Sequence, residues 1–136
     1  MQKPANQESL LLRTLAMPAD TNPHGDIFGG WIMSQMDIAG GIMAKSVSHG
    51  RTVTIAVESM KFIAPVTVGD TVCVYGRVVK VGNTSITIEL EVWVSKSWAE
   101  NPDDSARRKV TEARFIYVAI DADGDKRTIN QCAIPE

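Results

Sequence analysis

The feature that most constrains this chain is a single carboxylate inside an apolar, glycine-rich segment. Residues 29–44 read GGWIMSQMDIAGGIMA, with Asp37 near the middle and apolar residues on nearly every side of a helix. This pattern predicts a helix that is buried rather than one that lies on a surface. A charge in an apolar setting costs several kcal/mol unless it is paired, solvated or neutralised. Asp37 is therefore our first candidate for a functional acid, because catalytic carboxylates are commonly tuned by such surroundings.

Small residues share the predicted helix face of Asp37. Positions three, four and seven residues away are neighbours on a helix. Here they are Gly30, Met33, Ser34, Gly40, Gly41 and Ala44. Interior glycines cost roughly 1 kcal/mol each relative to alanine, so we expect a partner chain or a substrate to pack closely against this groove. The alternative is that Asp37 binds a nearby serine or backbone amide and only fixes how the helix packs.

Composition excludes several classes of protein. A chain of 136 residues suits a single domain spanning 1–136, with residues 1–9 as a flexible N-terminus. The net charge of −2 argues against a nucleic-acid partner, which needs a basic face. We expect no membrane association and a cytoplasmic location, because the sequence has neither a leader pattern nor an apolar run long enough to span a bilayer.

The cysteines and histidines give no sign of a metal site. Cys73 and Cys132 stand far apart and outside any CxxC pattern, so we interpret them as small apolar residues in a reducing compartment. His24 and His49 are equally distant, with no ligand spacing around them. We expect neither a metal nor a bound cofactor.

Periodicity predicts an α+β fold with one helix. A strand is expected at Leu10–Met17 with a mostly buried surface, and the helix should end near Gly50, with Lys45 and His49 in its last turns. Everything after the helix reads as sheet. Strands are expected at residues 52–63, 70–81, 85–97 and 109–120. Short turns between them predict an antiparallel meander that wraps the helix, and a second copy joined edge to edge would cover an unpaired strand.

The start of the helix offers a place for a developing negative charge. Backbone N–H groups are unpaired at a helix N-terminus, and Gly29 and Gly30 have no side chains to block them, so they are candidates for an oxyanion hole. Gly-Gly before a helix is also a common packing device. Asp37 lies roughly 10 Å along the axis from Gly30. A composite site, in which two antiparallel helices of a two-fold dimer contribute one end each, would bring these groups together.

Three segments of the sequence resemble a known family. They are residues 20–37 (DTNPHGDIFGGWIMSQMD), 53–63 (VTIAVESMKFI) and 68–70 (VGD). They resemble the YciA-like acyl-CoA thioesterases, and the resemblance runs from about Leu10 to Ile129. It implies a hot-dog fold, in which a five- to six-stranded antiparallel sheet wraps a central helix. It also implies a fatty-acid-related hydrolase of acyl-coenzyme A, built as dimers that form a homohexamer, with the thioester as substrate.

The resemblance also implies roles for individual residues. Asp37 would be the general base on water or the nucleophile, and Asn22 of the opposing subunit would orient the water or the carbonyl. Gly29 and Gly30 would supply the oxyanion amides. Relatives in the wider fold often carry histidine where this chain has Phe28, so no histidine need take part, and His24 is interpreted as a loop residue.

The phosphates of coenzyme A need cations or exposed amides. The candidates are Arg51, Lys61, Arg77, Lys80, Arg107, Arg108 and Lys109. Each of them is equally well explained as an ordinary solvated charge. Thr54 and its strand are candidates to bind the pantetheine arm, as the resemblance implies.

Two other functions stay open. A hot-dog dehydratase or hydratase acting on acyl thioesters usually needs an Asp/His pair, and no histidine is spaced to join Asp37. A non-catalytic acyl-CoA-binding protein would leave Asp37 unexplained. A pocket lined by Met33, Met36 and Met43 would adapt to different acyl chains, which favours broad specificity.

Overall fold

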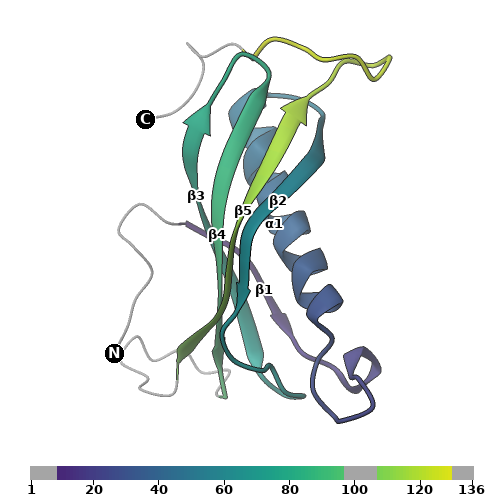
Figure 1. The fold of residues 1–136 in the computed structure, drawn as a ribbon, viewed down its shortest axis with the longest axis vertical. Helices are drawn as coiled ribbons and strands as arrows, with labels where there is room; N and C mark the ends of the chain where they lie inside the picture. The colour runs from purple at the N-terminus through teal and green to yellow at the C-terminus, as the bar shows by residue number, and fades with distance from the viewer. Residues whose placement is uncertain (1–8, 97–106, 130–136) are drawn as a thin grey trace.

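One helix and five strands make up the computed structural model, which describes residues 9–96 and 107–129 (Figure 1). The elements are β1 (Ser9–Leu15), the 3-10 helix η1 (Pro18–Asp20), α1 (Gly29–Ser48), β2 (Thr52–Phe62), β3 (Thr71–Val81), β4 (Ser85–Ser95) and β5 (Arg108–Ala119). The predicted order of strand, helix and four strands is confirmed. The flexible N-terminus expected at 1–9 lies outside the described residues except for Ser9, which already belongs to β1, and Cys132 lies outside them too.

The strands form a single antiparallel sheet in the order β1-β3-β4-β5-β2. The predicted simple meander is therefore wrong, because only β3, β4 and β5 follow one another as hairpins. After β2 the chain crosses the sheet and starts β3 next to β1, so β2 pairs with the last strand, β5. Thr54 of β2 consequently lies opposite Tyr117 of β5, although 63 positions separate them in the sequence.

Helix α1 lies against one face of this sheet (Figure 1). The predicted alternation in β4 is confirmed, since the inward side chains of this strand are buried throughout. They are Ile86, Ile88, Leu90, Val92 and Val94. From the helix, Ile32, Met36 and Ala39 are buried against them. The core therefore sits between one helix face and one sheet face.

The predicted helix end is confirmed to within two residues. Helix α1 runs for 20 residues, and His49 caps it in the left-handed conformation (φ 58°) while donating its backbone N–H to the carbonyl of Lys45. Such a left-handed residue satisfies carbonyls that would otherwise lack a donor. No helix in the described part of the chain is long and apolar enough to cross a membrane.

The outer side of α1 is open in this single chain, so the prediction of burial on all sides is wrong for the isolated protomer. Ile38 is 52% exposed and Ile55, on the neighbouring edge strand β2, is 57% exposed. The β1 edge is open as well, with Leu10 and Leu15 exposed, so the prediction that the first strand is mostly buried is also wrong. One sheet can cover only one side of a helix. The remaining apolar side of α1 and the β2 edge form a continuous candidate contact surface.

Candidate active site

Asp37 lies in the middle of α1 with its side chain exposed in the single chain. The Thr54 hydroxyl donates a hydrogen bond to Asp37 Oδ1 at 2.5 Å. The Tyr117 hydroxyl lies 3.2 Å from the same Oδ1 and 3.0 Å from the backbone carbonyl oxygen of Asp37. Three elements, α1, β2 and β5, therefore meet at this carboxylate. The carboxylate is bonded to the side-chain hydroxyls of Thr54 and Tyr117. The alternative raised by the sequence, in which Asp37 binds a nearby serine or a backbone amide, is therefore not what the structure shows.

A hollow of about 260 Å³ opens beside this carboxylate. Its lining consists of Met33, Ser34, Asp37, Thr54, Val57 and Phe115. Three of these six side chains are apolar, those of Met33, Val57 and Phe115. Of the three methionines expected to line a pocket, only Met33 does so here, since Met36 is fully buried and Met43 packs against the core. The helix turns these two side chains toward the sheet, away from the face that carries Asp37.

Tyr117 was missed by the sequence reasoning. It is an inward residue of β5, almost completely buried, with only its hydroxyl meeting polar groups. Burial raises the pKa of the Tyr117 phenol far above its ordinary value, and the negative charge of Asp37 and the hydrogen bond to it raise it further. The hydroxyl therefore stays protonated and acts as a donor to Asp37. The feature of the sequence that could have identified Tyr117 is a polar hydroxyl at an inward-facing position of a strand.

The glycines of the helix have different neighbours from those expected. A Cβ at Gly40 would collide with the Tyr117 hydroxyl, so this glycine makes room for a residue of its own chain. A Cβ at Gly41 or Gly30 would meet no atom within 4 Å in the single chain. The expectation of a partner or substrate at the groove is wrong at Gly40 and stays a prediction for the other two.

Both glycine amides at the start of α1 are available to a ligand. The neighbouring N–H groups are already used, since Phe28 donates to the carbonyl of Asp20 and Ile27 to that of Val66, each at 2.9 Å. Within the described residues no acceptor is bound to the amides of Gly29 or Gly30. The ring of Phe62 lies beside Gly29, 3.4 Å from where a Cβ would stand. The arrangement can hold an oxyanion.

Asn22 shapes the loop before the helix. Its Oδ1 accepts hydrogen bonds from the backbone N–H groups of His24 (2.9 Å) and Asp26 (3.1 Å). These two bonds fix which end of the amide is oxygen, and they leave Nδ2 with no bond to another described residue. Asn22 can therefore donate to a water or a carbonyl. His24 is an exposed loop residue, as predicted.

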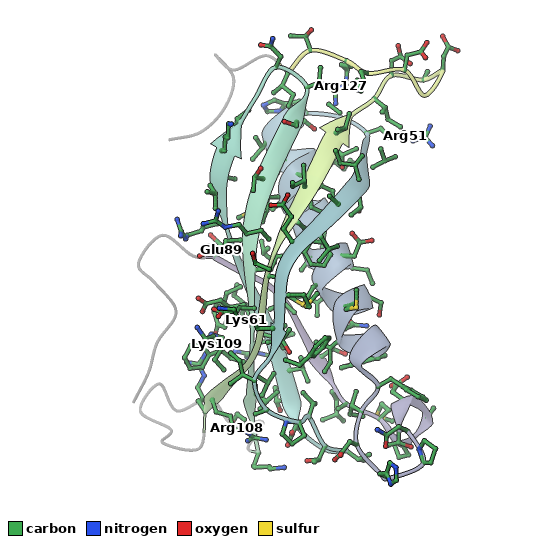
Figure 2. The ribbon with its side chains drawn as sticks, viewed as in Figure 1. Arg51, Lys61, Glu89, Arg108, Lys109 and Arg127 are labelled. Atoms are coloured by element: carbon green, nitrogen blue, oxygen red, sulfur yellow. The ribbon has the colours of Figure 1, made fainter. Side chains whose placement is uncertain are left out.

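Several of the predicted phosphate-binding cations lie on the sheet face away from the helix (Figure 2). Arg77 pairs with Glu89 at 2.8 Å, and Lys109 pairs with Glu112 at 3.0 Å. Lys61 lines a shallow hollow of about 230 Å³ beside these carboxylates. None of these cations is brought to Asp37 within one chain.

The remaining predicted cations occupy the two ends of the sheet. The guanidinium of Arg107 stacks over the rings of Tyr75 and Trp93, at 5.6 and 5.3 Å from their centroids. Arg108 lies 3.7 Å from Asp70, which is the buried carboxylate among the described residues. Arg51 is exposed at the end where α1 stops (Figure 2). These positions leave the phosphate-binding residues a prediction.

Comparison with known proteins identifies the family. The model of the thioesterase superfamily matches residues 24–97, more than half of the chain. The chain belongs to the thioesterase superfamily. It is 61% identical over 123 residues to the acyl-CoA thioester hydrolase YciA of Salmonella typhimurium, covering 90% of this chain and 91% of that protein. The resemblance found in the sequence is thereby confirmed.

Solved structures of this superfamily have the same fold. The hexameric broad specificity acyl-coenzyme A thioesterase HI0827, studied as an aspartate-to-alanine mutant, matches with a TM-score of 0.85 and 57% identity over 93% of this chain and 89% of that one. A hexameric hotdog fold thioesterase of Campylobacter jejuni matches with a TM-score of 0.82 and 43% identity over 90% of each chain. The α+β hot-dog fold is confirmed. Within the described residues, no group of three or more His, Cys, Asp or Glu side chains could hold a metal ion.

Proposed function

We propose that this thioesterase-superfamily chain hydrolyses acyl-CoA to a carboxylic acid and coenzyme A, with Asp37 as the catalytic carboxylate. The observation that carries the proposal is the geometry at Asp37, whose Oδ1 is held by Thr54 while its side chain opens into an apolar hollow. Close relatives are named acyl-CoA thioester hydrolases, which supports the same substrate class. The broad specificity named for HI0827 supports a wide range of acyl chains.

The active site is composite and needs a second copy of the chain. Gly29 lies eight residues before Asp37, about 12 Å along the helix axis, which is too far for both to contact one carbonyl group. The exposed apolar side of α1 and the β2 edge supply a surface on which a second copy can pack with its helix antiparallel. Asp37 of one protomer then faces Gly29, Gly30 and Asn22 of its partner. Hexameric relatives support a trimer of such dimers.

Hydrolysis proceeds by addition to the thioester carbonyl followed by loss of the thiol. In the general-base route, Asp37 takes a proton from water as the water oxygen attacks the carbonyl carbon. The carbonyl oxygen becomes an anion that the amides of Gly29 and Gly30 stabilise, while Nδ2 of Asn22 orients the water or the carbonyl. The C–S bond then breaks, and the thiolate of coenzyme A takes up the proton. In the nucleophilic route, Asp37 attacks the carbonyl carbon and expels the thiolate of coenzyme A as the C–S bond breaks. Water then cleaves the resulting anhydride, which releases the carboxylic acid, restores the Asp37 carboxylate and provides the proton that the thiolate takes up.

The phosphates of coenzyme A are assigned to cations of the chain. Arg51 is a candidate whose side chain is exposed at the end of the sheet where α1 stops (Figure 2). Lys61, Arg77, Arg107, Arg108 and Lys109 are retained as further candidates that would act from neighbouring protomers. Thr54 binds Asp37 in this chain, so we assign it to support of the carboxylate, with the pantetheine arm approaching its strand. A role in fatty acid metabolism in the cytoplasm stays a prediction.

The test compares wild type with Asp37→Asn across a panel of acyl-CoAs of different chain length, measuring release of free thiol. Asparagine keeps the shape of the side chain but removes the base, so we expect kcat to fall at least about 100-fold. Asp123→Asn is the matched control, because Asp123 is exposed in a hairpin turn. Absence of turnover by wild type on every substrate would overturn the enzyme and favour the non-catalytic binding protein. Hydration of enoyl-CoA without thiol release would favour the hydratase.

A further inference from the structure

We propose that Tyr117 is a positioning residue for Asp37, fixing Oδ1 with its hydroxyl so that Oδ2 is the oxygen presented to water or thioester. The inference rests on the proposed function, because it assigns the support of that same carboxylate. Tyr117 itself touches no reacting atom. It acts through the orientation and charge of Asp37.

The contacts support this role from two directions. The Tyr117 hydroxyl is within hydrogen-bonding distance of both Oδ1 and the backbone carbonyl of Asp37, at 3.2 and 3.0 Å. One group on β5 therefore contacts the side chain and the helix turn that carries it. Thr54 donates to the same Oδ1 from β2. Both hydroxyls therefore lie within hydrogen-bonding distance of Oδ1, and no hydrogen bond between described residues is made to Oδ2.

Gly40 provides independent evidence that this contact is specific. Glycine inside a helix is destabilising relative to alanine, yet a Cβ at Gly40 would overlap the Tyr117 hydroxyl. The overlap is with the hydroxyl first and with the ring carbons beside it less closely. The helix thus carries glycine at the one turn where the phenol must reach the backbone of Asp37.

The hydroxyl also supports the negative charge of Asp37. A donor bonded to a carboxylate stabilises its charged form, so Tyr117→Phe removes part of that support. Among the described residues packed around Asp37 on α1, β2 and β5, Tyr117 is the titratable group bonded to it. No Lys, Arg or His of the described chain lies within ion-pair distance of it. A comparison of the pH–rate profiles of wild type and a Tyr117 variant therefore tests this contact.

The experiment is the pH dependence of thioester hydrolysis by Tyr117→Phe. We expect kcat to fall about tenfold near neutral pH, KM to change little, and the acid limb of the pH–rate profile to be displaced from that of wild type. Tyr75→Phe is the matched control, since it removes the only other tyrosine hydroxyl of the chain, one that binds Arg107. Direct titration of the Asp37 carboxyl carbon by NMR, assigned with Asp37→Asn, gives the same shift without relying on activity.

A double variant separates positioning from simple packing. Gly40→Ala alone should destabilise the fold, whereas in Tyr117→Phe the missing hydroxyl leaves room for part of the new methyl group. We expect the double variant to recover thermal stability but to keep the displaced acid limb. An unchanged acid limb and kcat in Tyr117→Phe, with Asp37→Asn still inactive, would overturn the role of Tyr117 alone. Inactivity of wild type would instead overturn the proposed function.

Discussion

The end of helix α1 depends on Arg127, and replacing this residue gives a sharp test of how the structure is held together. Its Nη1 donates to the carbonyl of Ser48 at 2.9 Å, and its Nε donates to the carbonyl of Ile120 at 3.2 Å. Its Nη2 lies 3.3 Å from the carbonyl of Arg51 and 3.4 Å from the Ser48 hydroxyl. One guanidinium therefore joins the end of α1, the start of β2 and the segment after β5 (Figure 2).

The loss on Arg127→Ala can be estimated from these contacts. A hydrogen bond from a charged donor contributes about 1.5–3 kcal/mol net, and a cation at a helix C-terminus contributes about 0.3–1 kcal/mol. Only the bond to Ser48 is short, and Arg127 is half-exposed, so the contributions do not add fully. We expect a loss of about 2–3 kcal/mol in the free energy of unfolding. For a chain of this size this corresponds to a Tm about 10 °C lower.

Thermal unfolding followed by circular dichroism at one fixed protein concentration measures this loss, because assembly makes Tm depend on concentration. Arg51→Ala is the control, since its exposed side chain should contribute within about 0.5 kcal/mol. Arg127→Lys should recover only part of the loss, because an ammonium group cannot reproduce the planar fork of donors. A Tm for Arg127→Ala within 1 or 2 °C (roughly 0.5 kcal/mol) of wild type would refute the reasoning.

Two further predictions concern the β2 edge and the buried phenol. Ile55→Lys places a charge on an exposed edge strand, so if a second copy packs there, sedimentation velocity should show smaller assemblies than wild type and thiol release should fall with them; an assembly of unchanged size would place the contact elsewhere. In alkali, the unfolded Tyr117 phenol ionises near pH 10 while the folded one, with its raised pKa, stays neutral. The contribution of Tyr117 to the free energy of unfolding should stay constant below about pH 10 and then decline by up to about 1.4 kcal/mol for each further pH unit. In Tyr117→Phe this decline with pH should be shallower. If the free energy of unfolding, measured by urea titration at each pH, fell equally steeply in both proteins, the argument that burial raises the pKa of Tyr117 would be contradicted.

Local pattern was enough to predict the elements but not their order in the sheet. The alternation of β4 and the C-terminal end of α1 are properties of neighbouring residues, and both predictions are confirmed. The pairing of β2 with β5 depends on a crossover through residues 63–70, whose sequence does not state which strand comes next in space. Because this pairing was missed, Tyr117 could not be placed beside Thr54 and Asp37.

Burial was also misjudged for a physical reason. The sequence reasoning took Asp37 as the buried carboxylate, yet in the single chain Asp37 is exposed and Asp70 is fully buried. Asp70 is paired within its own chain, because its Oδ2 accepts a hydrogen bond from the Thr67 amide at 3.0 Å and its Oδ1 forms an ion pair with Lys96 at 2.7 Å. Apolar periodicity reports which side chains avoid water, without saying whether the cover comes from the same chain or from another copy.

The exposure of Asp37 bears on how its chemistry can work. A carboxylate open to bulk water is fully hydrated, and the apolar side chains beside Asp37, Met33 and Ile38, are left in water as well. A second copy packed on this face would cover both at once, lowering the local dielectric while the hydroxyls of Thr54 and Tyr117 keep the charge supported. It would also bring the backbone amides at the start of the second copy's helix close to the carboxylate. On this argument catalysis and assembly are coupled, so a variant that separates the protomers should lose thioesterase activity even though every residue of its own Asp37 network remains in place.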